Sequence, residues 1–165
     1  MNIEIVEVEE NRKDVLRRLL QLYEYEFSVF NETDVNDEGI FEYEHFDKYW
    51  VEENRHPYLF TYKGNIVGFA LVRTDLPSKL FDDQKVNEIA EFFIMKRYRR
   101  KGLGKKAAFK IFDEFPGKWE IWQLEKNIAS KKFWRSILGE YTDGEWHERW
   151  GDKGPIQYFD NSERR

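Results

Sequence analysis

The 165-residue chain contains no cysteine and only three histidines. Without cysteine it has no disulfide, no thiolate nucleophile and no thiolate metal ligand, which is compatible with a reducing cytoplasm. His45, His56 and His147 lack the spacing of metal ligands, so we predict no metal site. No apolar run approaches the length of a membrane span, and the first residues do not resemble a secretion signal. We therefore expect a cytoplasmic protein with no membrane partner.

Large apolar side chains, in contrast, are abundant. Apolar residues make up 41% of the chain and aromatic residues 18%, which is enough to build one substantial core. A length of 165 residues fits one domain. We predict a single domain over residues 1–160 and a disordered tail over residues 161–165.

Charge is distributed unevenly along the chain. The formal net charge of -5 disfavours nucleic acid as a partner. The segment 24–53 has one lysine, Lys48, and the acids Glu24, Glu26, Glu32, Asp34, Asp37, Glu38, Glu42, Glu44, Asp47, Glu52 and Glu53. The segment 96–106 has no acid and carries Lys96, Arg97, Arg99, Arg100, Lys101, Lys105 and Lys106.

Apolar periodicity and turn residues predict the element order β-α-α-β-β-β-α-β-α-β-β. The expected strands cover residues 1–7, 58–62, 66–74, 86–95, 118–124, 140–146 and 155–159. The expected helices cover residues 12–30, 42–50, 103–115 and 129–138, and Gly139 is expected to end the last of them. Lys63-Gly64-Asn65 predicts a tight hairpin with glycine and asparagine at positive backbone angles. Only the second half contains a β-α-β crossover, so this is a mixed α/β chain.

A basic glycine turn joins the apolar strand 86–95 to the following helix. Gly102 and Gly104 let backbone amides approach a ligand closely, and the first turn of a helix leaves amides without partners. A polyphosphate would satisfy these donors, with help from the Arg99 side chain. The alternative is a solvated basic turn that only begins a helix.

Two other phosphate-binding motifs were compared with this turn. A nucleotide P-loop requires Ser or Thr after Gly-Lys, whereas Lys106 follows Gly104-Lys105. The stretch 102–107 does satisfy the G-x-G-x-x-A pattern of dinucleotide-binding oxidoreductases, and Glu125 lies at a suitable distance. Too few strands follow for a doubly wound sheet, so this alternative is the weaker one.

Two spaced motifs resemble the GNAT superfamily of N-acetyltransferases. The residues 99–104, Arg-Arg-Lys-Gly-Leu-Gly, match its Arg/Gln-x-x-Gly-x-Gly/Ala motif. The residues 127–134 are similar to its Asn-x-x-Ala-x-x-Phe-Tyr motif, with departures at Ser130 and Trp134. The resemblance covers about residues 88–138. It implies a mostly antiparallel, twisted central sheet with one parallel β-α-β crossover and helices on both faces.

The resemblance implies acetyl-CoA as the acyl donor. Its pyrophosphate is expected on the glycine turn, at Arg99, Arg100, Lys101, Gly102, Leu103, Gly104 and Lys105. Its pantetheine arm is expected beside Phe92, Phe93 and Ile94, with Asn127 as a further contact. Asn127 can also cap the helix that follows it, and the two roles are compatible.

Acyl transfer to an amine requires a neutral nucleophile. An alkyl amine with a pKa near 10.4 needs roughly 4.6 kcal/mol for deprotonation at pH 7, whereas a leaving thiol with a pKa near 8.5 needs only about 2 kcal/mol to ionise. A base therefore matters more than an acid. Glu88 and Glu91 on the central strand are equal candidates for the base, by resemblance. The family's general acid aligns with Trp134, which cannot supply a proton, so Tyr141 and solvent are the alternatives. By resemblance to the family, a strand amide near Ile94 is expected to stabilise the tetrahedral intermediate.

The acidic, aromatic segment 24–53 lies where the superfamily forms its acceptor site. It favours a cationic primary amine, such as a polyamine, an aminoglycoside or a lysine side chain. A solvated acidic surface around core aromatic residues explains the same composition. The sequence allows a homodimer. A non-catalytic acyl-CoA sensor or interaction module is the main alternative to an enzyme.

Overall fold

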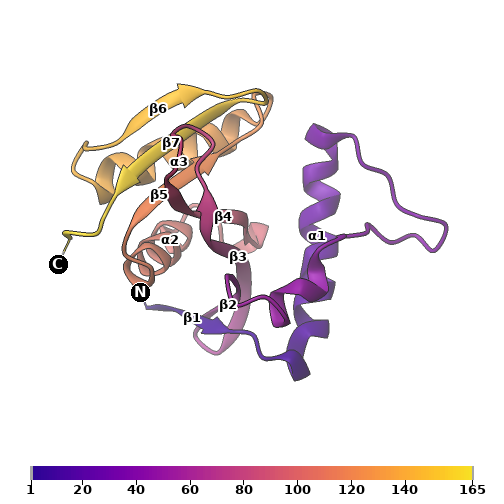
Figure 1. The fold of residues 1–165 in the computed structure, drawn as a ribbon. Helices are drawn as coiled ribbons and strands as arrows, with labels where there is room; N and C mark the ends of the chain where they lie inside the picture. The colour runs from indigo at the N-terminus through magenta and orange to yellow at the C-terminus, as the bar shows by residue number, and fades with distance from the viewer. Residues whose placement is uncertain (1, 165) are drawn as a thin grey trace.

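The computed structural model describes residues 2–164, which form a seven-stranded sheet in the order β1-β2-β3-β4-β5-β7-β6 (Figure 1). The strands are β1 (Ile3–Glu7), β2 (Arg55–Tyr62), β3 (Asn65–Pro77), β4 (Lys85–Ile94), β5 (Lys118–Trp122), β6 (His147–Trp150) and β7 (Pro155–Asp160). The helices are α1 (Lys13–Asn31), α2 (Leu103–Glu114) and α3 (Ile128–Tyr141), with short 3-10 turns η1 (Glu10–Arg12), η2 (Phe46–Trp50) and η3 (Lys96–Tyr98). Among these strands, β4 and β5 run parallel and the other neighbours run antiparallel. The expected fold class is confirmed.

The two faces of the sheet bury separate apolar clusters. The helices α2 and α3 cover one face, and α1 with η2 covers the other (Figure 1). Side chains of β3 alternate between the clusters: Ala70 and Val72 pack toward α2 and α3, whereas Phe69 and Leu71 pack toward α1. This alternation follows from the two-residue period of a strand, and it explains why the central strands are apolar on both sides.

Four details of the predicted elements are wrong. The segment 42–50 is helical only in η2, and the predicted strand 140–146 is not a strand because α3 continues through Gly139 to Tyr141. The left-handed residues that end this helix region are Asp143 and Gly144, while Gly139 has helical geometry. In the β2–β3 hairpin the positive φ angles belong to Lys63 and Gly64, at 51° and 79°, and Asn65 already starts β3.

Described residues of the expected tail, 161–164, contact the rest of the domain. Asn161 is buried, and its side-chain amide donates hydrogen bonds to the Phe112 carbonyl and the Tyr141 hydroxyl. The guanidinium of Arg164 lies 4.1 Å from the centre of the Tyr141 ring. Residue 165 lies outside the described residues. Within residues 2–164, no helix has the length and apolar character required to cross a bilayer.

Candidate active site

The glycine turn has the backbone geometry of an anion site. Arg100 and Gly102 adopt left-handed conformations, with φ angles of 60° and 77°, between the end of β4 and the start of α2. Successive backbone N–H groups in turns with left-handed residues can form a concave anion-binding site. No side chain caps the start of α2, where the first helical bond runs from the Lys106 amide to the Gly102 carbonyl. The amides of Leu103, Gly104 and Lys105 in the first turn of α2 are therefore left for a ligand.

Gly104 is required for a different reason. A β-carbon at this position would lie 3.2 Å from the ring of Phe133 and 3.5 Å from the Ile94 side chain. The absence of a side chain thus lets the first turn of α2 approach both α3 and β4. The predicted phosphate site and the predicted pantetheine site are therefore close together.

The strands β4 and β5 pair only through Asn87↔Trp119 and Glu88↔Glu120. Beyond Glu88, β4 continues to Ile94 without a partner from β5 in the described chain. Backbone groups on that side of the 89–94 stretch can bind a ligand that lies alongside the strand. This stretch contains the predicted pantetheine residues Phe92, Phe93 and Ile94, and it leads directly into the glycine turn.

A β-bulge places the two candidate bases on the same face of the sheet. Leu71 pairs with Glu91 and Val72 with Ile89, so Ala90 is the extra residue. In a regular strand, residues three apart point to opposite faces, and the extra residue restores Glu88 and Glu91 to one face. Ile89 packs under α2 and α3, so both glutamates point toward the α1 side. The bulge was not predicted from the sequence.

The carboxyl group of Glu91 is held in a poorly hydrated environment beneath α1. Burial, followed by the negative charge of Glu24 and, with less effect, that of Glu88, raises the pKa of Glu91 from 4.5 to about 8. The Tyr23 hydroxyl donates a long hydrogen bond of 3.4 Å to its Oε1 atom, which opposes this rise. The side chain keeps some solvent contact, but the surrounding protein removes enough hydration to disfavour the charged form. Sequence reasoning missed Tyr23, because it fits the apolar face of α1.

The Glu88 carboxylate has strong partners. Its Oε1 atom accepts hydrogen bonds from the Trp122 indole at 2.8 Å and from the Lys79 ammonium at 3.1 Å. The side chain is buried, whereas Lys79 remains partly exposed. Glu88 is thus placed as a fixed, paired carboxylate at the point where β4 and β5 separate.

Three other predicted residues have clear structural partners. Asn127 caps α3, with its Oδ1 atom accepting a 3.1 Å hydrogen bond from the Ser130 amide. Trp134 is 5% exposed and contacts the rings of Phe92 and Phe133. The Tyr141 hydroxyl donates to Asp113 at 2.8 Å, near the C-terminal end of α2 and away from the glycine turn at its N-terminal end. The geometry therefore does not bring Tyr141 together with the two glutamates.

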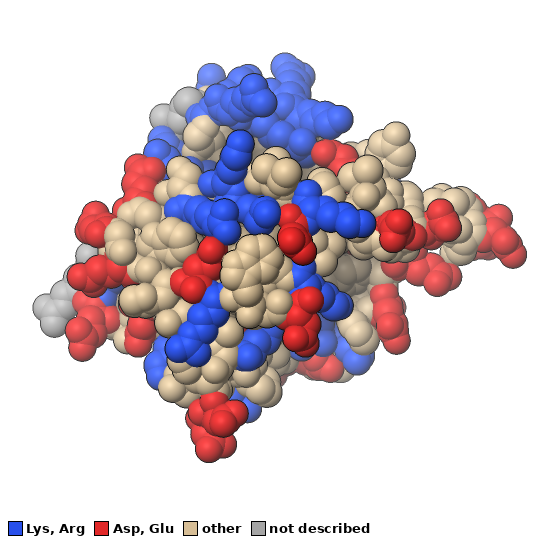
Figure 2. All heavy atoms as spheres, turned by 90° about the horizontal axis from the view of Figure 1, so that it is seen from above, with Lys and Arg blue, Asp and Glu red and all other residues tan. Residues whose placement is uncertain are grey.

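The oppositely charged segments meet at the ion pair between Glu26 and Arg99, at 2.8 Å, and elsewhere most of their charged side chains project to different sides (Figure 2). Acidic side chains project to the right in Figure 2, on the same side as the loop after α1 in Figure 1, and Lys and Arg gather at the upper edge of that view. Some acids of segment 24–53 have structural partners: Asp47 pairs with Lys13 at 3.4 Å, and Glu52 pairs with Arg55 at 2.6 Å. The acidity of this segment is therefore partly structural.

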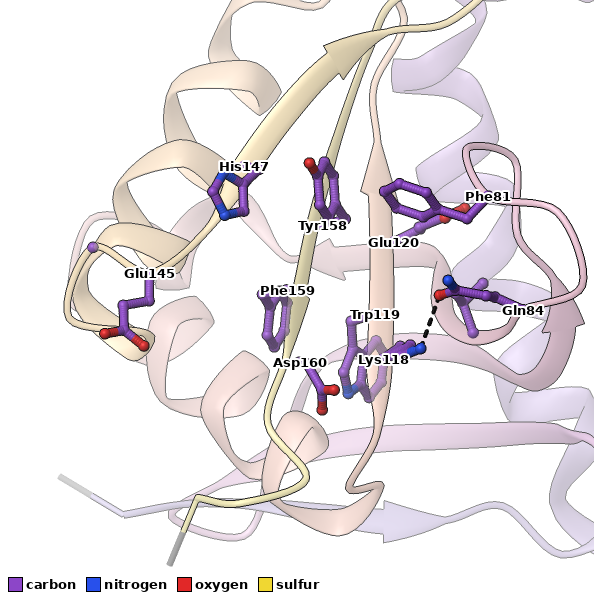
Figure 3. Close-up of a pocket in the computed structure, with 12 residues that line it drawn as sticks. Phe81, Gln84, Lys118, Trp119, Glu120, Glu145, His147, Tyr158, Phe159 and Asp160 are labelled. Carbon is purple, nitrogen blue, oxygen red and sulfur yellow. Dashed lines mark hydrogen bonds between the residues drawn. The ribbon is translucent and has the colours of Figure 1, made fainter.

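A separate cavity of about 600 Å³ lies at the N-terminal end of β5, beside β7 (Figure 3). Phe81 and His147 flank the ring of Tyr158, with centroid separations of 5.1 and 5.2 Å. The residues that line it include no predicted site residue. A carboxyl group with a raised pKa beside an open strand and a glycine turn is the stronger indication of chemistry, so we place the candidate site at Glu91.

A family model described as acetyltransferase (GNAT) family matches residues 16–139. This range contains β4, the glycine turn, both glutamates and Asn127. A comparison with curated proteins finds no match.

Solved structures with the same fold include several acetyltransferases. An acetyltransferase from Thermus thermophilus has a TM-score of 0.70 at 13% identity, over 96% of this chain and 95% of that chain. An aminoglycoside acetyltransferase from an uncultured soil metagenomic sample, in complex with sisomicin, has a TM-score of 0.56 at 22% identity, over 82% and 86%. The ribosomal-protein-S18-alanine N-acetyltransferase of Escherichia coli has a TM-score of 0.63 at 12% identity, over 96% and 94%. At these identities the similarity shows the fold.

Proposed function

This chain belongs to the acetyltransferase (GNAT) family, and from that premise we propose that it transfers the acetyl group of acetyl-CoA to a primary amine, with Glu91 as general base. The observation that carries the proposal is the raised pKa of Glu91, about 8, on the strand that leads into the glycine turn. The dinucleotide-binding alternative is set aside, because β4 and β5 are the one parallel pair in the described sheet.

Donor binding is proposed at the glycine turn and along β4. The amides from Arg100 to Lys105 would bind the pyrophosphate, whereas the Arg99 amide already donates to the Lys96 carbonyl at 3.1 Å. The free side of the strand near Phe92, Phe93 and Ile94 would bind the pantetheine amides. Each hydrogen bond to a charged group contributes roughly 1.5 to 3 kcal/mol. Several bonds of this kind would dominate the affinity for the donor.

The raised pKa makes Glu91 a better proton acceptor. Transfer of a proton from an ammonium group with a pKa near 10.4 to a carboxylate with a pKa of 4.5 is unfavourable by about 8 kcal/mol. For Glu91, with a pKa of about 8, the cost falls to about 3 kcal/mol. Burial and the nearby carboxylates thus lower the cost of the proton transfer itself by about 5 kcal/mol, while ionisation of Glu91 beforehand costs about 1.4 kcal/mol at pH 7.

In the proposed reaction, the amine nitrogen attacks the acetyl carbonyl, the new C–N bond forms and the C–S bond breaks. One ammonium proton goes to Glu91 before the attack, and the second nitrogen proton leaves to solvent as the tetrahedral intermediate collapses. Coenzyme A leaves as a thiolate, which takes a proton from solvent. The amide near Ile94 is the proposed donor to the developing oxyanion. Glu88, which is paired with Lys79 and Trp122, would shape the charge of the site and leave the proton transfer to Glu91.

The acceptor is proposed to be a cationic amine of a small molecule or of a lysine side chain. Glu24 is buried, its pKa is raised by burial, and it lies near enough to Glu91 to influence that pKa. An arriving ammonium group would stabilise the charged forms of both carboxyls. Tyr23 and Tyr43 add aromatic rings with hydroxyl groups on the α1 side, which suits contact with a cation.

The test is an acceptor screen that measures thiol release from acetyl-CoA, with wild type, Glu91→Gln and Glu88→Gln. General-base catalysis contributes typically about 10²- to 10⁴-fold, so Glu91→Gln should lower kcat by at least about a hundredfold. Glu88→Gln is the matched control and should retain kcat within about tenfold, since its role is indirect. Comparable losses in the two variants would contradict the assignment of Glu91.

A second candidate function for the protein is that of a non-catalytic acyl-CoA sensor. Trp134 favours it, because this residue occupies the position of the family's proposed proton donor and is buried among aromatic rings. Tight coenzyme A binding without thiol release, with any amine of a broad panel, would favour the sensor. Turnover with one amine excludes it.

A further inference from the structure

The side chain of Arg99, the first residue of the glycine motif, is bound to α1. Its Nη1 and Nη2 atoms donate to the two carboxylate oxygens of Glu26 at 3.0 and 2.8 Å. Its Nε atom donates to the Ile94 carbonyl at 2.6 Å, and the guanidinium lies 5.5 Å from the centre of the Phe93 ring. Three of its five N–H donors are thus engaged by the end of β4 and by a helix that is 73 residues distant in sequence.

This arrangement differs from the expectation that the Arg99 guanidinium contacts phosphate. A bidentate arginine–carboxylate pair fixes the plane of the guanidinium, and the third bond fixes the side chain to the strand end. Arg99 itself has an extended backbone, and left-handed Arg100 follows it directly. The clamp therefore fixes the position from which the amide-bearing turn begins.

We propose that Glu26 is a positioning residue for coenzyme A: through Arg99 it holds the glycine turn in the conformation that binds the pyrophosphate. This inference rests on the proposed function. Preorganised donors bind more tightly, because the ligand does not have to order them. Both side chains of the pair are about one-third exposed, at 37% and 32%, so its loss should affect overall stability little.

The Glu26→Gln variant distinguishes a positioning role of Glu26 from a simple effect of its charge. Glu26 is a negative charge near a site for a polyanion, so Coulomb forces alone predict that its removal strengthens coenzyme A binding. Positioning predicts the opposite. We expect the Kd for coenzyme A, measured by titration calorimetry, to rise roughly tenfold, since a bond to a charged group contributes more than about 1.4 kcal/mol.

The kinetic readout is specific as well. The KM for acetyl-CoA should rise by a similar factor, while kcat and the KM for the amine stay within about twofold. Glu26→Asp, which keeps the carboxylate on a shorter chain, should restore part of the affinity. General loss of structure would instead lower kcat and the melting temperature together.

Glu140→Gln is the matched control. It removes the carboxylate that pairs with Lys105 at 3.1 Å, in the first turn of α2, and leaves Arg99 untouched. Its coenzyme A affinity should be unchanged or slightly higher. Unchanged or tighter binding in Glu26→Gln would overturn the positioning role. Absence of coenzyme A binding by the wild type would overturn the proposed function itself, and this inference with it.

Discussion

Replacing Glu91 by glutamine tests whether this carboxyl is protonated in the folded protein at neutral pH. Burial and then the charges of Glu24 and Glu88 raise its pKa from 4.5 to about 8. The unfolded chain ionises near 4.5, so between these pH values unfolding releases a proton. The stability contribution of the protonated group is fully present below pH 4.5 and is lost as pH rises to about 8. Glutamine at this position cannot ionise and should lack this pH dependence.

The magnitude follows from the two pKa values. At pH 8.5, ionisation of the Glu91 carboxyl stabilises the unfolded state by the equivalent of about 4 pKa units and the native state by about 0.6. The net effect is about 3.4 units in favour of the unfolded state. At pH 5.5 the net is about 1 unit, so the difference is about 2.4 units, or roughly 3 kcal/mol. Because Glu91 keeps some solvent access, we expect a measured change of roughly 1.5 to 3 kcal/mol.

The assay is urea unfolding of wild type and Glu91→Gln at pH 5.5, 7 and 8.5, followed by tryptophan fluorescence. The free energy of unfolding of the variant, minus that of the wild type, should grow with pH. Glu38→Gln makes the same substitution in the exposed loop after α1 and corrects for the general effect of losing a glutamate. A difference that is flat across this range would refute the argument that burial keeps Glu91 protonated.

Three further outcomes are expected. Acetyl-CoA should raise the melting temperature and NAD should not; a shift with NAD alone would contradict donor binding at the glycine turn. Gly102→Ala should weaken coenzyme A binding, because alanine costs roughly 1 kcal/mol at a φ angle of 77°, and calorimetry measures this. Gly68→Ala should abolish folding or destabilise by more than about 3 kcal/mol in urea unfolding, since its β-carbon would lie 2.0 Å from the Phe93 carbonyl oxygen. The matched control Gly139→Ala, inside α3 with 3.7 Å of clearance, should stabilise by about 0.5 to 1 kcal/mol.

Local sequence signals predicted the parts of the site that are themselves local. The glycine turn follows from two glycines at the end of an apolar strand, and the Asn127 cap follows from a single side chain at the start of a helix. Both depend on residues a few positions apart. Most of the order of elements along the chain was also predictable from apolar periodicity, apart from the helix expected at 42–50 and the strand expected at 140–146.

Features that depend on distant residues were not predictable. The β-bulge at Ala90 exists because β3 and β4 pair with unequal numbers of residues, and strand composition does not reveal this. The Glu26–Arg99 pair joins α1 to the turn after β4, and each residue alone looks like part of a charged surface. The prediction from Gly139 was wrong because glycine permits the end of a helix without requiring it: α3 continues to Tyr141, and the left-handed residues Asp143 and Gly144 follow.

The bulge also explains how two carboxyls on one face of a strand can have different surroundings. Glu88 accepts two hydrogen bonds, from an ammonium and an indole N–H group, which compensate the burial of its carboxylate. Glu91 has a single long bond from Tyr23 and the charge of Glu88 nearby, and both burial and that charge disfavour its ionisation. Pairs of carboxyls in contrasting environments are typical of acid–base sites. Because Glu88 contributes to the pKa of Glu91, a loss of activity in a Glu88 variant would not identify Glu88 as the base. The base is the residue whose substitution removes the pH dependence of kcat. Substitution of Glu88 would lower the pKa of Glu91 and so move that pH dependence to lower pH without removing it.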